Sequence, residues 1–136
     1  MSDDDSVMAS AAALFDAIER KDVDAVARLY ADDVAVWHNF DDVSQNKSAN
    51  LAVLRGLCEH VPAIRYEIVE RHSLGDGRIV QRHVLRARTA SGAEIAIPAC
   101  IFVTVQGGRI TRIDEYLDTA QANRLRAATG RPPVGG

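Results

Sequence analysis

The sequence has few cysteines, no long apolar run and no basic cluster, and each absence limits what the chain can be. No stretch approaches the roughly 18 apolar residues of a membrane-spanning helix, so we expect no membrane insertion. The 16 Lys and Arg residues are scattered and the formal net charge is −3, so nucleic acid is not an expected partner. The start, MSDDDSVMAS, is acidic where a secretory signal is basic, which predicts a cytoplasmic protein.

Motifs that bind metals or nucleotides, or that activate a serine, are also missing. Cys58 and Cys100 show no CxxC spacing, and we interpret them as buried thiols instead of a disulfide or a metal pair. The 4 histidines show no HxH or HxxxH spacing, so no metal site is expected. The sequence contains no GxSxG, Walker or GxGxxG motif, and no cofactor is implied.

The residues that are present predict one domain that begins with helices. A chain of 136 residues, 47% of them hydrophobic, suits a single compact domain. We predict that it spans residues 6–127, between a disordered N-terminus at 1–5 and a loose tail at 128–136. Apolar residues at helical spacing predict helices over 6–22, 21–33, 44–61 and 119–129, with Ser6 and Asp22 as N-caps and Pro62 ending the third.

Strands are expected before and after the third helix. The apolar alternation of VAVWHNFDD, residues 34–42, predicts the first strand. The turn signals GDG, ASG and QGG then separate four more, at 63–74, 78–89, 94–105 and 109–118. Because short turns join antiparallel neighbours, we expect an α+β fold with an antiparallel or mixed sheet.

The strand at 94–105 is apolar on both faces, which bears on assembly. Helices are expected to cover one side of the sheet only, so another surface must cover the second side. We therefore predict a homodimer through the open face of the sheet. The two faces of this strand alternate as Ile95, Ile97, Ile101 and Val103 on one side and Ala96, Pro98, Cys100 and Phe102 on the other.

The order of elements, together with LYADDVAVWHNFDD (29–42) and GGRITRIDEYLD (107–118), resembles a known superfamily. This is the nuclear-transport-factor-two-like superfamily, which includes ketosteroid isomerases, limonene epoxide hydrolases, scytalone dehydratase and SnoaL-like polyketide cyclases. The resemblance covers about residues 6–125. It implies a cone-shaped fold in which a curved sheet wraps over the N-terminal helices and encloses a single deep, largely apolar pocket.

The two enzyme families of this group lead to different expectations for the site. The resemblance to ketosteroid isomerases places their Asp base at His38 and their two oxyanion donors at Leu14 and Cys100. Leu14 donates no hydrogen bond and Cys100 is a poor donor, so classical steroid isomerisation is not expected. The resemblance to epoxide hydrolases places an acid–base relay at three other positions and a water-holding pair on the early strand. The relay positions are Gln81, His83 and Glu115, and the pair is Trp37 and Asn39.

Spacing alone also draws attention to the relay positions. Gln81 and His83 are two residues apart and share one face of their strand, and Glu115 shares a face with apolar neighbours. A buried carboxylate beside His83 would hold one imidazole tautomer and raise its basicity. Two alternatives stay open: His83 is a satisfied interior histidine, or Glu115 pairs with an arginine and stabilises the sheet.

The direction of the side chains on the early strand stays open. The isomerase alignment turns His38 toward the pocket, whereas the hydrolase alignment turns Trp37 and Asn39 toward it. We favour Trp37 and Asn39 inward, with His38 on the other side or at the edge of the sheet. The other side chains predicted to bind the ligand are Leu14, Phe15, Leu54, Cys100 and Phe102.

These observations favour a cofactor-free acid–base enzyme acting on a small hydrophobic molecule, of the isomerase, hydratase, epoxide hydrolase or cyclase type. His83 would act as general base or acid with Glu115 as its partner, while Asn39 and Gln81 orient substrate or water. Two other functions stay open: a non-catalytic pocket that binds a hydrophobic metabolite, and a structural dimerisation module with a filled core.

Overall fold

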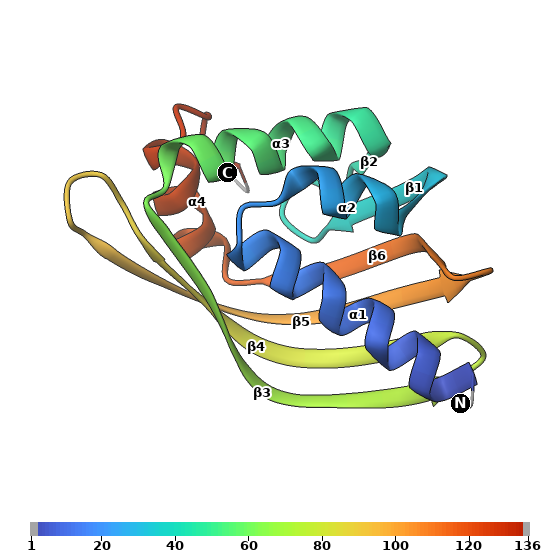
Figure 1. Ribbon diagram of the computed structural model, residues 1–136. Coiled ribbons are helices and arrows are strands. Elements are labelled where there is room, and N and C mark those ends of the chain that lie inside the picture. The colour runs from blue at the N-terminus through green and yellow to red at the C-terminus, as the bar shows by residue number, and fades with distance from the viewer. Residues whose placement is uncertain (1–2, 135–136) are drawn as a thin grey trace.

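The computed structural model, which describes residues 3–134, has an α+β architecture in which most helices come before a run of four strands (Figure 1). The elements are α1 (Asp3–Glu19), α2 (Val23–Leu29), β1 (Tyr30–His38), β2 (Ser44–Gln45), α3 (Lys47–His60), β3 (Ala63–Gly75), β4 (Arg78–Arg88), β5 (Glu94–Gln106), β6 (Arg109–Leu117) and α4 (Thr119–Ala128). No helix of the described residues is long and apolar enough to cross a membrane.

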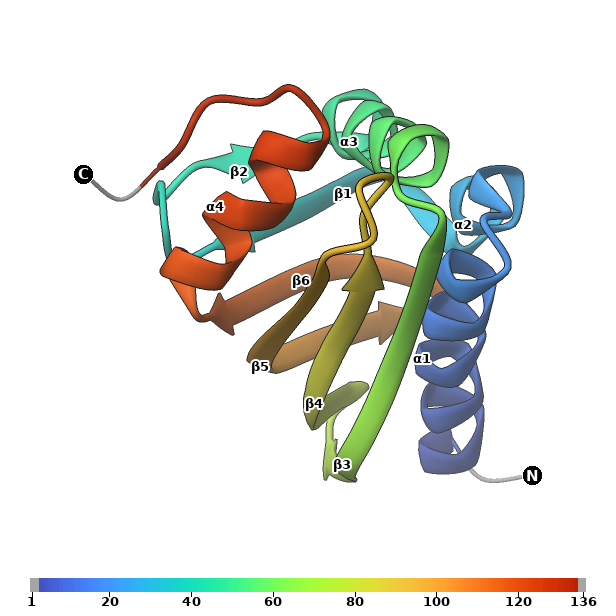
Figure 2. The same ribbon diagram turned by 90° about the vertical axis from the view of Figure 1, so that its left-hand side faces the viewer.

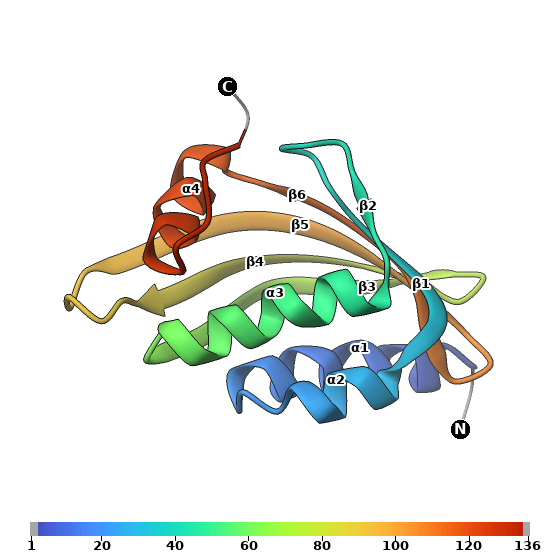
Figure 3. The same cartoon turned by 90° about the horizontal axis from the view of Figure 1, so that it is seen from above.

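The strands form one 6-stranded sheet with the order β2-β1-β6-β5-β4-β3. The pairing of β1 with β6 is parallel and the other pairings are antiparallel, so the sheet is mixed. It curves, and α1, α2 and α3 lie on the same side of it (Figure 3). The predicted α+β fold with a curved sheet over helices is confirmed, whereas a single deep pocket stays a prediction.

Most element boundaries follow local rules, with one difference at the N-terminus. Asp22 caps α2 as predicted, since its Oδ1 accepts a hydrogen bond from Ala25 N at 3.0 Å. Helix α1 begins at Asp3 instead of Ser6, because three aspartates in its first turn interact favourably with the helix dipole. The prediction of disorder is therefore wrong for residues 3–5, while residues 1–2 lie outside the described part.

The predicted loose tail is instead folded back onto α4 as far as Val134. The side chain of Asn123 donates to Val134 O at 2.9 Å and accepts from Val134 N at 2.8 Å. Nε of Arg126 donates to Pro132 O at 2.7 Å. Contacts of this kind hold a terminal segment in place. Figure 2 shows the chain turning back after the end of α4. Residues 135–136 lie outside the described part.

Strand alternation separates a buried inner face of the sheet from a half-buried outer face. On β5, Ile97 and Ile101 are buried, whereas Cys100 and Phe102 on the other face are half-buried. Cys58 and Cys100 are free cysteines, and both are half-buried instead of fully buried as predicted. On β5 the outer face is thus apolar but open, whereas the neighbouring strands carry ion pairs there, such as Arg82–Glu70 and Arg112–Asp114. The homodimer remains a proposal.

Candidate functional site

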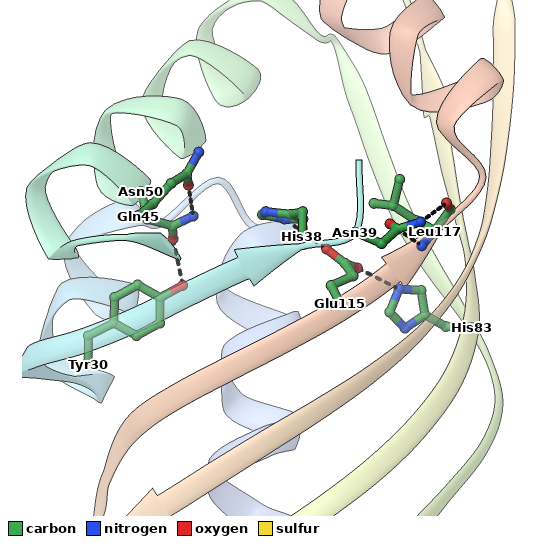
Figure 4. A network of polar contacts seen from close by, with 8 residues as sticks. All are labelled: Tyr30, His38, Asn39, Gln45, Asn50, His83, Glu115 and Leu117. Carbon is green, nitrogen blue, oxygen red and sulfur yellow. Dashed lines mark hydrogen bonds and ion pairs between the residues drawn. The ribbon is translucent and has the colours of Figure 1, made fainter. Parts of the chain in front are cut away.

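The carboxylate of Glu115 lies between two histidines (Figure 4). The parallel register of β1 and β6 pairs His38 with Glu115, so both side chains point to the inner face. Nε2 of His38 lies 3.1 Å from Oε1 of Glu115, and Nε2 of His83 lies 3.7 Å from Oε2. The carboxylate is therefore hydrogen-bonded to His38 and faces the His83 ring across a gap too long for a normal hydrogen bond.

His83 reaches Glu115 across the intervening strand β5 because a small residue stands between them. The register pairs His83 with Ala99 and Ala99 with Leu117. A methyl group at this position leaves the inner face of β5 open, whereas a larger side chain would fill the space between the imidazole and the carboxylate. Ala99 therefore allows two non-adjacent strands to share one polar site.

A chain of hydrogen bonds determines which nitrogen of His83 carries hydrogen. Nε of Arg71 donates to Oε1 of Gln81 at 2.6 Å, so the amide group turns its NH₂ toward His83. Nε2 of Gln81 lies 2.7 Å from Nδ1 of His83. An amide NH₂ only donates, so Nδ1 accepts and the ring hydrogen is on Nε2, the atom that faces Glu115.

Glu115 is ionised in this arrangement. Burial by itself raises the pKa of its carboxyl group, but the contact with His38 and the electrostatic effect of the two imidazoles outweigh burial and lower the pKa to about 2. The Glu115 side chain is 17% exposed, whereas the His83 side chain is 1% exposed. A negative charge is thus held at the inner face of the sheet by two imidazoles.

Two ring nitrogens of the site have no hydrogen-bond partner within the described residues. They are Nδ1 of His38 and Nε2 of His83, and both are buried. A buried polar atom without a partner costs on the order of 1–3 kcal/mol. A ligand with matching polar groups would remove this cost.

A cavity of about 150 Å³ adjoins the histidines and Glu115. An apolar cavity of this volume suits a molecule of about the size of benzene. Its apolar wall comes from α3, the sheet and α4 and consists of Leu54, Leu57, Leu85, Ile97, Leu117 and Leu125. The cavity therefore combines a small apolar volume with the negative charge of Glu115 on its sheet side.

Tyr66 adds a neutral hydroxyl group to the cavity wall. Its ring centroid lies 5.0 Å from that of His83 and 4.9 Å from that of Phe15, edge-on in both cases. Burial, with the negative charge of Glu115, raises the pKa of Tyr66 well above its ordinary value. Tyr66 therefore stays protonated, and within residues 3–134 its hydroxyl has no hydrogen-bond partner, which leaves it free for a ligand.

A second polar group lies on the α3 side of the cavity. The hydroxyl of Tyr30 donates to Oδ1 of Asn50 at 2.8 Å, and Nδ2 of Asn50 donates to Oε1 of Gln45 at 2.9 Å. Asn50 and Gln45 both line the cavity. Burial raises the pKa of Tyr30, so its hydroxyl remains a donor that orients Asn50.

The predicted orientation of the early strand is wrong. Val34 and Val36 are each 2% exposed on the inner face, and uninterrupted alternation places His38 there as well. Trp37 faces the other side, where its Nε1 donates to Oδ1 of Asp42 at 2.7 Å and its ring meets Tyr116 edge-on. The pairing of β1 with β6 shifts register between Tyr30 and Ala35, before the segment that carries Trp37 and His38. This irregularity therefore does not turn Trp37 inward.

Asn39 also lies outside the cavity, because its amide is used by the backbone. Its Oδ1 accepts from Leu117 N at 3.0 Å, and its Nδ2 donates to Leu117 O at 3.4 Å. Asn39 N donates to Glu115 O at 3.1 Å. Asn39 thus joins the ends of β1 and β6 and supports Glu115 indirectly.

Of the apolar residues predicted to bind the ligand, only Leu54 lines the cavity. Leu14 and Phe15 are buried in the core between α1 and the sheet, where Phe15 packs 5.5 Å from the ring of His83. Cys100 and Phe102 face outward because they alternate with inward residues on β5. Gln81 is buried behind His83 and does not line the cavity.

Several cavity residues were not predicted from the sequence. Asn50 carried a usable signal, since it lies four residues before Leu54 on the buried face of a helix. Phe40, Arg126 and Arg131 carried none, because they lie in loops or at a helix end whose path depends on tertiary packing. Within residues 3–134, no three His, Cys, Asp or Glu side chains are grouped as ligands of a metal ion.

Comparison with known proteins identifies a sequence family and several similar solved structures. The sequence profile described as "SnoaL-like domain" matches residues 11–113. A comparison with curated proteins finds no match. At the identities found among solved structures, 14–22% in the examples that follow, the likeness shows the fold alone.

Three of these structures illustrate the likeness. PrhC from Penicillium brasilianum NBRC 6234 has a TM-score of 0.83 and 14% identity, with 95% of this chain and 91% of that chain covered. An LEH-like epoxide hydrolase from M. tuberculosis has a TM-score of 0.74 and 17% identity, with 88% of each chain covered. An NTF2-like protein of unknown function from Burkholderia pseudomallei has a TM-score of 0.75 and 22% identity, with 92% and 98% covered.

Proposed function

This chain belongs to the SnoaL-like domain family, and we propose that it is a cofactor-free acid–base enzyme that transfers a proton within a small, largely apolar substrate. One observation carries the proposal: an ionised carboxylate, Glu115, held between two imidazoles beside a small apolar cavity. Carboxylate–imidazole pairs of this kind are a common means of accepting and returning a proton near neutral pH.

His38 is the general base in this proposal. An ionised carboxylate only accepts hydrogen bonds, so the Nε2 that contacts Glu115 carries hydrogen, and the neutral ring has its lone pair at Nδ1. Nδ1 is the atom that lacks a partner, and an acidic C–H or O–H of a substrate would supply one. Glu115 then stabilises the imidazolium that forms when Nδ1 takes the proton.

His83 is the donor in this proposal, which exchanges the roles expected from the sequence. Its Nε2–H is separated from Glu115 by 3.7 Å and is available to a carbonyl, epoxide or hydroxyl oxygen of the substrate. Gln81 and Arg71 act as positioning residues, because they keep the hydrogen on Nε2. Isomerisation, hydration, dehydration and cyclisation can all use a base paired with a hydrogen-bond donor of this kind.

The test is turnover of small enones, epoxides and hydroxyketones by the wild type and by His38→Gln, His83→Gln and Glu115→Gln. We expect each variant to lower kcat by about 10²–10⁴, the usual contribution of a general acid or base. His72→Gln is the matched control, since His72 is exposed and pairs with Glu70 away from the cavity.

The alternative functions predict different results in the same experiment. A non-catalytic binder would bind members of the panel without turning any of them over, and a structural module would bind none. Either result overturns the enzymatic proposal, as would variants of His38 and Glu115 with unchanged kcat.

A further inference from the structure

Two arginines line the cavity from α4 and the segment after it. They are Arg126 and Arg131, and both are half-buried. Arg131 N donates to Arg126 O at 2.9 Å, which fixes their backbones close together. The same cavity is therefore lined by two positive charges, from α4 and the segment after it, and by the Glu115 carboxylate from the sheet.

Neither guanidinium group is neutralised by the protein within the described residues. No carboxylate of residues 3–134 lies within 4.0 Å of either, although seven other arginines of the chain do form such pairs. Burial, and after it the charge of Arg131, lowers the pKa of Arg126, while the negative charge of Asp41 opposes this effect. Two like charges brought together at a cavity, with no carboxylate of the described residues within 4.0 Å of either, favour an anionic ligand.

The Arg126 side chain is held in place but is not fully used. Its Nε donates to Pro132 O at 2.7 Å, and its guanidinium carbon lies 5.5 Å from the centroid of the Phe40 ring. The terminal nitrogens have no hydrogen bond to the described residues, so they are available to a carboxylate. The other face of Phe40 is occupied as well, because its ring stacks on His38 at 4.9 Å and 13°.

We propose that the ligand of this cavity is a small organic acid, whose carboxylate binds Arg126 and Arg131 while its apolar part extends toward His38 and His83. The inference rests on the proposed function, since it names the substrate class of the same site. The negative charge of Glu115 repels a carboxylate, and the two arginines attract it, so the charges orient the ligand in one direction. The volume of about 150 Å³ limits the apolar part to about one ring.

The test compares benzoate with benzamide, which have nearly the same shape but differ in charge, by calorimetry and ligand-observed NMR. We expect the wild type to bind benzoate at least about tenfold more tightly than benzamide. Arg126→Gln and Arg131→Gln should each lower the affinity for benzoate about tenfold and leave benzamide unchanged. Arg131→Lys, which keeps the charge, should retain part of the preference.

Arg124→Gln is the matched control, because Arg124 lies on the same helix but is exposed and contacts Gln121 instead of the cavity. Thermal unfolding of each variant separates lost binding from lost folding. Equal affinity for the two probes, binding of neither, or a preference that survives in the Arg126→Gln/Arg131→Gln double variant would overturn the proposal.

His38→Gln distinguishes this inference from the proposed function. We expect this variant to lose turnover and to keep its preference for benzoate. If the preference is lost with His38 and kept without the arginines, the anion binds at the histidines and the inference is wrong. If the preference depends on the arginines but the wild type turns over no substrate, only the enzymatic proposal fails.

Discussion

Nε2 of Gln81 lies 2.7 Å from Nδ1 of His83, and this contact sets the tautomer of the histidine. The side-chain amide of Gln81 cannot flip, because Nε of Arg71 donates to its Oε1 at 2.6 Å. Arg71 on β3 thus acts through Gln81 on β4, and the hydrogen-bearing Nε2 of His83 faces Glu115 on β6.

The tautomer of His83 is the first prediction. Long-range ¹H–¹⁵N spectra of the imidazole should show hydrogen on Nε2 in the wild type. In Gln81→Glu a carboxylate would accept from both Arg71 and His83, so the hydrogen should move to Nδ1 and kcat should fall about tenfold or more. A wild-type spectrum with hydrogen on Nδ1 would contradict the assignment, and the exposed His72 provides an internal reference.

Acid stability should depend on Glu115. Its pKa in the folded protein, about 2, is lower than the ordinary value of 4.5, so folding favours the ionised form. The stabilisation is therefore present above pH 4.5 and is lost as the pH falls toward 2, with a magnitude of roughly 3 kcal/mol. Urea unfolding of the wild type should weaken across this interval, and Glu115→Gln should show a smaller change. Parallel curves for the two proteins would refute this prediction.

Asn39→Ala should lower stability more than it alters chemistry. The amide makes two hydrogen bonds to the backbone of Leu117, and loss of such bonds costs about 1–2 kcal/mol in the free energy of unfolding. Chemical denaturation measures this loss, and kcat should fall only a few-fold. A hundredfold loss of kcat in a variant of unchanged stability would instead support the substrate-orienting role predicted from the sequence.

The outer face of the sheet should mediate a homodimer. Val69 and Tyr116 are 52% and 50% exposed there, next to the half-buried Val84 and Cys100. Light scattering coupled to size exclusion should give a dimer for the wild type and a monomer for Tyr116→Glu. Ala52→Glu is the control, since Ala52 is exposed on α3, on the other side of the sheet. A monomeric wild type would rule the interface out.

Local patterns in the sequence account for much of the sheet and for half of the site. The inward direction of Gln81, His83 and Glu115 follows from period-two alternation, which depends only on the chirality and pleat of a strand. The same rule places His38 inward, because Val34 and Val36 precede it, whereas the resemblance to epoxide hydrolases predicts the opposite direction. Asn39 was misassigned because a polar side chain at a strand end serves the backbone as readily as a ligand.

Local sequence patterns predict the order of the helices and long strands, the turns between them, and the inward faces of β4 and β6, since these features depend on neighbours in the chain. The pairing of β1 with β6, and hence the close contact of His38 instead of His83 with Glu115, depends on tertiary packing. Tertiary packing also returns the end of the chain to α4 and brings Arg131 to the cavity. The physical reason is that such contacts join residues far apart in the chain, and their geometry depends on how whole elements pack.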